Sequence, residues 1–263
     1  MSDKEKVVFS PEKEGKKELI FDPKETILKN AEIDGEPRRV QGSNEVFYIK
    51  LASPEVAGAI FKPAEGENIF PDQGYYKPGD YYKRERAAYL VDRFFGFDLI
   101  PPTVIREING KIGSAQEFIP NHRAGWQFKE REDLVATNEQ DFIKMAVLDF
   151  IIWNADRNMT NIFIINKNKQ ERLLAIDNSL SFGESGIFNA EGMDKLVCLD
   201  QIPGEIISKI EQALANRETM EVFRNMLSEL LSPEEIDKFF DRLERVIYKK
   251  RITDEDIADF SYL

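Results

Sequence analysis

The chain has 263 residues and carries 36 Lys and Arg against 48 Asp and Glu, a formal net charge of −12. Such acidity disfavours general binding of nucleic acid and constitutive docking on an anionic membrane, because both surfaces attract clustered cations. The single cysteine, Cys198, rules out an intramolecular disulfide and fits a reducing compartment. The first residues lack the apolar core of a signal peptide, and no apolar run approaches the roughly 20 residues of a membrane span. We therefore expect a cytoplasmic protein.

The first 63 residues change in character near residue 41. Residues 1–40 are polar with two short apolar islands, which leaves open a flexible arm or short strands added to a sheet edge. Residues 46–49 and 57–62 are rich in β-branched and aromatic side chains, and a Gly42-Ser43-Asn44 turn precedes the first run. We expect two strands here, followed by a long Gly- and Pro-rich loop over residues 64–80.

A helix is predicted over Tyr81–Phe95, where apolar residues recur at helical spacing until Gly96 ends the pattern. Residues 103–105 then read as a strand. Asn109-Gly110 is a strong hairpin signal, so residues 112–119 should form the returning strand, which Pro120 ends.

After residue 120 the pattern becomes mostly helical. A broad apolar face predicts a helix over residues 141–153, and residues 161–165 and 172–176 predict a β-hairpin. Residues 202–252 predict two or three amphipathic helices, one of them capped by Ser232 with Pro233 in its first turn. The sum is an α+β fold of two lobes: an N-terminal extension (1–40), a β-rich N-lobe with one main helix (41–120) and a mostly helical C-lobe (121–263).

Five polar residues stand where the apolar pattern makes them conspicuous: Lys62, Glu85, Asp156, Asn161 and Asp177. Glu85 lies in the first turns of the predicted helix, and the other four end or follow apolar segments. Taken singly, each is more simply a solvated or turn residue. Taken in order, they supply a strand lysine, a helix glutamate, an aspartate with an asparagine five residues on, and a second aspartate after a hairpin. Phosphoryl transfer uses such a set to hold phosphates, metal and the acceptor hydroxyl.

Longer segments around these residues carry a family resemblance: residues 58–63, 85–89, 96–104, 113–118, 156–161 and 176–177. With them the chain resembles the atypical protein-kinase-like family that includes phosphatidylinositol 3-/4-kinases and HipA-type kinases. It is most similar to small bacterial phosphatidylinositol-kinase-like proteins. The resemblance spans roughly residues 40–185 and implies a two-lobed, protein-kinase-like fold.

The resemblance also implies roles for individual residues. Lys62 would contact the α- and β-phosphates of ATP, with Glu85 orienting it, and Asp156 would orient or deprotonate the acceptor hydroxyl. Asn161 and Asp177 would hold Mg²⁺, or Mn²⁺ in its place. The remaining nucleotide contacts would come from two segments. A turn that covers the phosphates would consist of Gly42, Ser43 and Asn44. A hinge whose backbone groups recognise adenine would consist of Glu117, Phe118 and Ile119.

Two positions depart from the family pattern. Asn158 stands where the family has histidine, so an imidazole is absent, and Asp177-Asn178-Ser179 replaces the usual Asp-Phe-Gly. Neither change removes a metal ligand or the candidate base.

The expected activity is an ATP- and magnesium-dependent kinase acting on a hydroxyl. Residues 200–263 carry 9 basic and 15 acidic side chains, which favours a protein acceptor over an anionic lipid; a toxin-type kinase with one protein target fits equally well. Two alternatives stay open: a nucleotide-binding pseudokinase scaffold, and a kinase-fold enzyme that transfers AMP.

Overall fold

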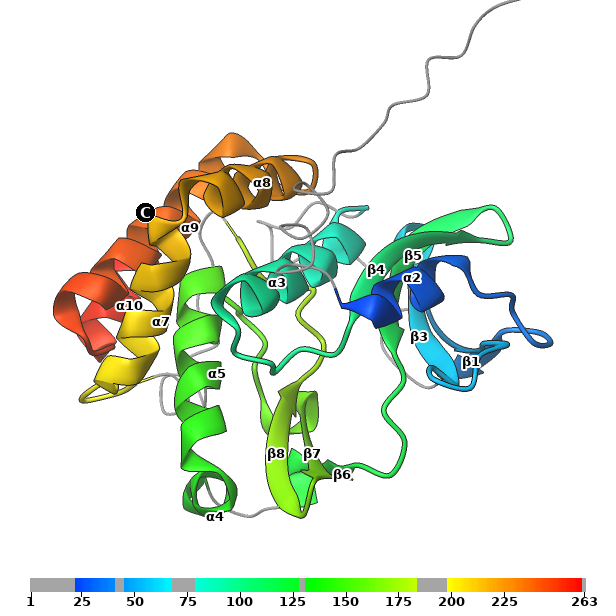
Figure 1. Cartoon of the computed structure of the whole chain (residues 1–263), viewed down its shortest axis with the longest axis horizontal. Coiled ribbons are helices and arrows are strands. Elements are labelled where there is room, and N and C mark those ends of the chain that lie inside the picture. The colour runs from blue at the N-terminus through cyan, green and yellow to red at the C-terminus, as the bar shows by residue number, and fades with distance from the viewer. Residues whose placement is uncertain (1–21, 41–44, 68–78, 128–130, 184–197, 262–263) are drawn as a thin grey trace, which may run out of the picture.

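The computed structural model describes residues 22–40, 45–67, 79–127, 131–183 and 198–261. Two sheets and a set of helices make up these residues (Figure 1), so the mixed α+β class is confirmed. None of the described helices is long and apolar enough to cross a membrane.

The larger sheet is antiparallel, with strand order β1-β2-β3-β5-β4. Its strands are β1 (Arg38–Val40), β2 (Val46–Lys50), β3 (Gly58–Pro63), β4 (Thr103–Ile108) and β5 (Lys111–Glu117). In the centre of the sheet Lys62 pairs with Ser114. Next to that pair, an added Cβ on Gly113 would lie 2.3 Å from the Lys62 carbonyl oxygen, so the strand that flanks Lys62 requires a glycine here.

The hairpin between β4 and β5 turns at Asn109 and Gly110, whose φ angles are 52° and 79°. Two consecutive residues with positive φ are typical of the tight turns that match the twist of antiparallel strands, so the predicted hairpin is confirmed. Strand β5 ends at Glu117, two residues before the predicted end.

Residues 1–40 were expected to form an arm or edge strands, and the described part contains a helix that neither alternative included. Helix α2 (Pro23–Asn30) begins with a capping box, in which the Asp22 side chain accepts from Lys24 N and the Glu25 side chain accepts from Asp22 N. Strand β1 does lie at the sheet edge. Helix α2 packs its apolar face, with Leu28 fully buried, on the sheet.

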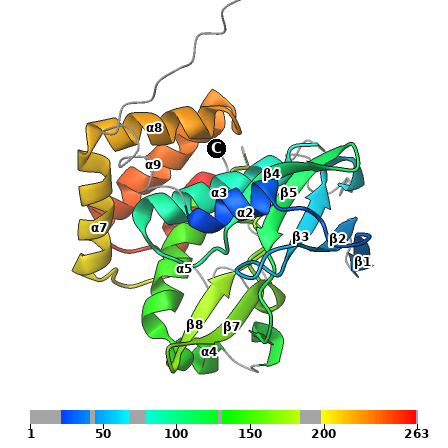
Figure 2. The same ribbon diagram turned by 45° about the vertical axis from the view of Figure 1, so that its right-hand side comes forward.

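Helix α3 (Tyr81–Phe95) ends at Gly96, which has φ 65°, as predicted. It lies beside α2 (Figure 2), and Glu25 joins the two helices by accepting from the Tyr89 hydroxyl at 2.9 Å and pairing with Arg86 at 2.7 Å. The apolar side chains of α3, however, belong to the core of the helical half rather than to the core under the sheet.

The second half of the chain contains the predicted long helix, the predicted β-hairpin and a C-terminal bundle. A small sheet has the order β6-β7-β8, and Ser232 caps α9 in a capping box with Glu235, as the sequence predicts. The elements are β6 (Arg123–Ala124), α4 (Arg131–Thr137), α5 (Glu139–Ile152), β7 (Ile162–Lys167), β8 (Gln170–Ala175), α7 (Gly204–Ala215), α8 (Arg217–Ser228), α9 (Pro233–Lys249) and α10 (Asp254–Ser261). Short 3-10 turns η1 (Ala64–Gly66), η3 (Gly125–Gln127) and η4 (Met159–Asn161) connect them.

Candidate active site

Lys62 lies where the large sheet meets the helical half, and two carboxylates contact it. Its Nζ donates to Glu85 Oε1 on α3 and, at 2.7 Å, to Asp177 Oδ1 in the loop after β8. Burial alone would lower the pKa of Lys62, but the charges of Asp177 and Glu85 outweigh it and raise the pKa above its ordinary value. Lys62 therefore stays protonated, and three of the five predicted site residues meet here.

Glu85 is almost fully buried, and both of its oxygens are used. While Oε1 faces Lys62, Oε2 accepts a hydrogen bond of 3.0 Å from the backbone N–H of Asn178. The first turn of α3 is held by Glu67, whose carboxylate accepts from the backbone N–H groups of Tyr81 and Tyr82 at 3.2 and 2.9 Å. This anchoring fixes the helix that presents Glu85.

The other two predicted residues, Asp156 and Asn161, form a second pair. Asn161 Nδ2 donates to the backbone oxygen of Asp156 at 2.8 Å and to its Oδ2 at 3.2 Å. Because Nδ2 is occupied in this way, the amide oxygen Oδ1 of Asn161 is the atom left to act as a ligand. Burial and the nearby charge of Asp177 raise the pKa of Asp156, although hydrogen bonds from Asn158 and Asn161 oppose the shift.

Asn158, at the family's histidine position, holds the loop together. Its Nδ2 donates to Asp156 Oδ1 at 3.2 Å, and its Oδ1 accepts from the backbone N–H of Thr160 at 2.9 Å. The side chain thus orients the Asp156 carboxylate by hydrogen bonding, without a group that titrates near neutral pH.

Asp177 has a backbone φ of 53°, a conformation that residues other than glycine adopt only when their surroundings impose it. Its side chain is 41% exposed, so it contacts Lys62 and also faces solvent. Burial opposes the shift, but Lys62 and a hydrogen bond of 3.1 Å from Ser179 Oγ keep the pKa of Asp177 below its ordinary value. The carboxylate is therefore ionised and accessible.

A buried polar network that our sequence analysis did not include joins these loops. Arg157 is 1% exposed and makes a two-point ion pair with Asp149 of α5, at 2.9 and 3.1 Å. Its Nη1 donates to the backbone oxygens of Asn161 at 2.9 Å and Ile176 at 2.7 Å. Arg157 thus fixes the residue before Asp177 against Asn161. The available sequence signal was Asp149, a carboxylate inside the otherwise apolar stretch Met145–Trp153.

The predicted nucleotide contacts are less completely described. Gly42, Ser43 and Asn44 lie outside the described residues. The Glu117 carboxylate pairs with Lys24 of α2 at 2.6 Å, and it is not among the groups that contact Lys62.

The two residues after Glu117 are held by local contacts. The Phe118 ring packs edge-on against Tyr48 with centroids 5.0 Å apart, and its backbone N–H donates to Gly58 O at 3.0 Å. The Ile119 carbonyl oxygen lies 2.8 Å from His122 Nδ1. Residues 117–119 are thus packed against β2 and β3, and the backbone N–H groups of Glu117 and Phe118 already have acceptors, since Glu117 donates to Pro102 O at 2.8 Å.

The donor atoms fit a magnesium ion that is shared with a phosphate ligand. Among the described residues, no three His, Cys, Asp or Glu side chains form a metal-binding group. Mg²⁺, however, is commonly held by only one or two protein oxygens, while phosphates and water complete its shell. The Asn161 amide oxygen and the Asp177 carboxylate match that requirement in number and in type.

Comparisons with known proteins agree with this geometry. The structure is similar to that of hydra Fam20 with sugar (TM-score 0.62, 17% identity, 90% of this chain and 88% of the other). It is also similar to the Helicobacter pylori proinflammatory kinase CtkA (TM-score 0.51, 14% identity, 85% and 95%). At these identities the likeness shows the fold, which is protein-kinase-like as predicted. No curated protein matches the sequence. The family model for phosphatidylinositol 3- and 4-kinase matches residues 78–239, more than half of the chain, and the chain therefore belongs to the phosphatidylinositol 3- and 4-kinase family.

Proposed function

We propose that this protein is an ATP- and magnesium-dependent kinase that transfers the γ-phosphoryl group to a hydroxyl of a protein. One observation carries the proposal: Lys62 Nζ donates to both Glu85 and Asp177, and these three residues come from three separate segments of the chain. A lysine held by one carboxylate on a helix and placed beside a second, solvent-facing carboxylate is suited to bind phosphates next to a metal ion.

The nucleotide would bind at Lys62. The lysine ammonium would contact the α- and β-phosphates, and Glu85 would keep it oriented. Backbone N–H groups of the 42–44 turn would cover the phosphates, while backbone groups of residues 117–119 would recognise adenine. On this proposal residues 41–120 form the nucleotide-binding lobe, residues 121–263 the catalytic lobe, and residues 1–40 an extension.

Asn161 and Asp177 would hold Mg²⁺, and Mn²⁺ could occupy the same oxygen ligands. When bound, the cation neutralises phosphate charge and aligns the phosphates. This is essential in a chain of net charge −12, which otherwise repels ATP. The ionised state of Asp177, which Lys62 maintains, prepares the chain for that ion.

Asp156 would orient the acceptor hydroxyl and take its proton. Burial and the nearby charge of Asp177 raise the pKa of Asp156, which makes the carboxylate a stronger base than an ordinary aspartate. The hydrogen bonds from Asn158 and Asn161 restrict its rotation, so one carboxylate oxygen keeps a fixed direction.

The acceptor is proposed to be a protein because of charge. Residues 200–263 carry 9 basic and 15 acidic side chains, which gives an anionic lipid headgroup no large cationic surface. A cytoplasmic setting, which the single cysteine favours, is part of the same proposal.

The test uses the purified chain with Mg²⁺ and ATP that is labelled separately on the α- and γ-phosphates, with and without candidate acceptor proteins. We expect γ-label to be transferred by the wild type and lost in both Asp156→Ala and Asp177→Ala. Transfer of α-label would instead indicate AMP transfer. Magnesium-dependent ATP binding without any transfer would support a pseudokinase scaffold, and absence of ATP binding would refute the proposal.

A further inference from the structure

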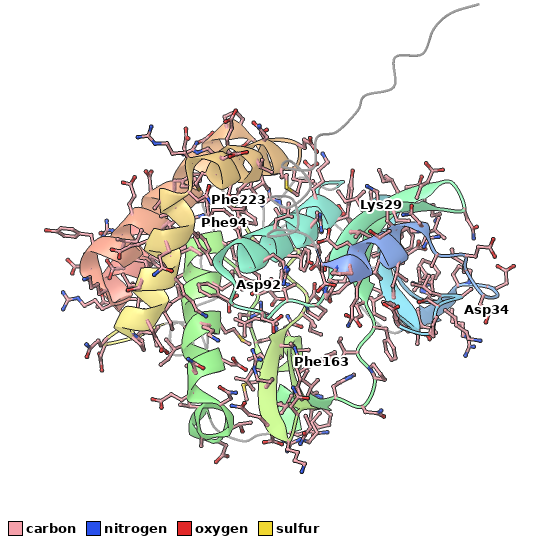
Figure 3. The ribbon with its side chains drawn as sticks, viewed as in Figure 1. Lys29, Asp34, Asp92, Phe94, Phe163 and Phe223 are labelled. Carbon is pink, nitrogen blue, oxygen red and sulfur yellow. The ribbon has the colours of Figure 1, made fainter. Side chains whose placement is uncertain are left out.

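A pocket lies between the C-terminal end of α3 and helices α7 and α8. Its volume is about 420 Å³. Figure 3 shows Phe94 of α3 and Phe223 of α8 side by side here; their rings stack with centroids 4.0 Å apart. Two cations line the pocket and no carboxylate does; the lining is Arg93, Phe94, Phe95, Gly96, Lys209, Gln212, Ala213, Asn216 and Thr219. In a chain of net charge −12 such a lining is unusual.

Two buried donor groups at this pocket lack an acceptor among the described residues. Arg93 Nε and Thr219 Oγ1 are both shielded from solvent, and neither has a hydrogen-bond partner there. Thr219 as a whole is 9% exposed. A buried donor without an acceptor costs roughly 1–3 kcal/mol, so two at one pocket indicate that an acceptor-rich group belongs between them.

The start of α8 adds a favourable field. Asn216 caps this 12-residue helix by accepting from Thr219 N at 3.1 Å, and both residues line the pocket. The first N–H groups of a helix lack intrahelical acceptors, and the helix dipole places partial positive charge there. The α8 terminus, Arg93 and Lys209 therefore favour the same sign of ligand charge.

The negatively charged and hydrogen-bond-accepting groups at the end of α3 already have hydrogen-bond donors. The end of α3 offers backbone carbonyl oxygens, but those of Arg93 and Asp92 accept from Gly96 N at 3.2 Å and Phe97 N at 3.1 Å. The Asp92 carboxylate accepts from the backbone N–H groups of Leu99 and Ile100 and does not line the pocket. Beside the cations Arg93 and Lys209, the lining offers the polar side chains of Gln212, Asn216 and Thr219, and Glu218 stands next to Thr219 in the first turn of α8.

We propose that this pocket binds a small oxyanion of the phosphate class, at a site separate from the proposed nucleotide site. Arg93 and Lys209 would supply charge, and the Thr219 hydroxyl and the first amides of α8 would donate hydrogen bonds. The volume exceeds that of a single phosphate group, so a phosphomonoester also fits. Arg93 stands eight residues after Glu85 on α3, which is about 12 Å along the helix. The ligand would therefore join the helix that carries Glu85 to the C-terminal bundle.

The test measures thermal unfolding and amide hydrogen exchange of the whole chain as inorganic phosphate is added, with sodium chloride at matched ionic strength as the reference. Phosphate should raise Tm in a saturable manner and slow exchange at the start of α8. Arg93→Gln should weaken binding about tenfold or more, since it removes a charge-assisted hydrogen bond. Thr219→Val removes the hydroxyl at nearly constant shape and should weaken binding less.

Two control variants locate the effect. Lys29→Gln removes one positive charge from the exposed face of α2 and should bind phosphate as the wild type does. Lys62→Met should also keep the protection at α8, because phosphate bound at the nucleotide site would respond to Lys62 instead. O-Phosphoserine is titrated beside inorganic phosphate: tighter binding of the ester would identify a phosphomonoester as the ligand, and the reverse would identify free phosphate.

The proposal is overturned by any of three results. Phosphate that raises Tm no more than chloride does would show that no specific site exists. Equal phosphate affinity in the wild type, Arg93→Gln and Thr219→Val would show that the pocket is not the site, as would protection that follows Lys62 and not Arg93. If Arg93→Gln fails to fold, Thr219→Val alone decides.

Discussion

Replacing Asp92 with Asn should stabilise the protein at neutral pH and remove part of its dependence on pH. The Asp92 carboxyl is fully buried near the end of α3 and accepts only backbone N–H groups, from Leu99 at 3.1 Å and Ile100 at 3.2 Å (Figure 3). Burial raises its pKa from 3.8 to about 7, since these hydrogen bonds only partly compensate for lost hydration.

Proton linkage gives the sign and the size of the contribution that Asp92 makes to the pH dependence of stability. Between the ordinary pKa and the raised one, the folded protein holds a proton at Asp92 that the unfolded chain has released, so stability falls as pH rises. Each pH unit in that window corresponds to about 1.4 kcal/mol, so the full loss is about 4 kcal/mol above pH 7. The portion between pH 5 and pH 7, about 3 kcal/mol, lies in a range that is easily measured.

Asn has the same shape, offers an acceptor to both N–H groups and cannot ionise. Urea unfolding of the wild type and Asp92→Asn at half-unit steps from pH 5 to pH 8 measures the difference in their free energies of unfolding. Taking this difference cancels the other titrating groups, which the two proteins share. The free energy of unfolding of the variant, relative to that of the wild type, should increase with pH up to about pH 7 and stay constant above it. A difference that is constant across the whole range would refute a buried, titrating Asp92.

Three further variants test the packing around the site. Arg157→Met should lower stability by about 3–5 kcal/mol in denaturant unfolding, because it leaves the buried Asp149 carboxylate unpaired; a loss below 1 kcal/mol would contradict the network described. Phe223→Ala should cost about 3–5 kcal/mol by opening a cavity against α3, while the half-buried Phe240→Ala serves as control and should cost clearly less. Asn158→His should leave the melting temperature nearly unchanged, since an imidazole can still donate one hydrogen bond; a fall of more than about 3 °C, roughly 1 kcal/mol for a chain of this size, would show that the amide holds the loop in a way that a ring cannot.

The order of Lys62, Glu85, Asp156, Asn161 and Asp177 could be recognised in the sequence because four of them end or follow apolar segments and Glu85 lies in the first turns of a clearly periodic helix. In the structure Lys62 donates to Glu85 and Asp177, and Asn161 donates to Asp156. Their catalytic roles remain predictions, to be decided by the transfer experiment.

Other features depend on contacts between segments that are distant in the sequence, and local sequence patterns do not predict which side chains make these contacts. The Arg157 guanidinium finds Asp149, eight residues earlier, and Ile176, 19 residues later, only once α5 and the β7–β8 hairpin have packed. In the same way Glu117 pairs with Lys24, 93 residues away. Helix α2 is a different case: its Asp22-to-Glu25 capping box is visible in the sequence, but few apolar residues accompany it.

The packing of α3 has a consequence for motion between the two halves of the molecule. Besides joining the apolar core of the helical half, α3 is tied to it through Arg84, which donates to Glu235 Oε1 of α9 and to the Ser181 carbonyl oxygen, both at 2.5 Å. Arg86 of α3, however, pairs with Glu25 of α2 and donates to the Thr103 carbonyl oxygen of β4, so α3 is tied to the sheet half as well. Any motion of the sheet relative to the bundle therefore has to break polar contacts on one side of this helix.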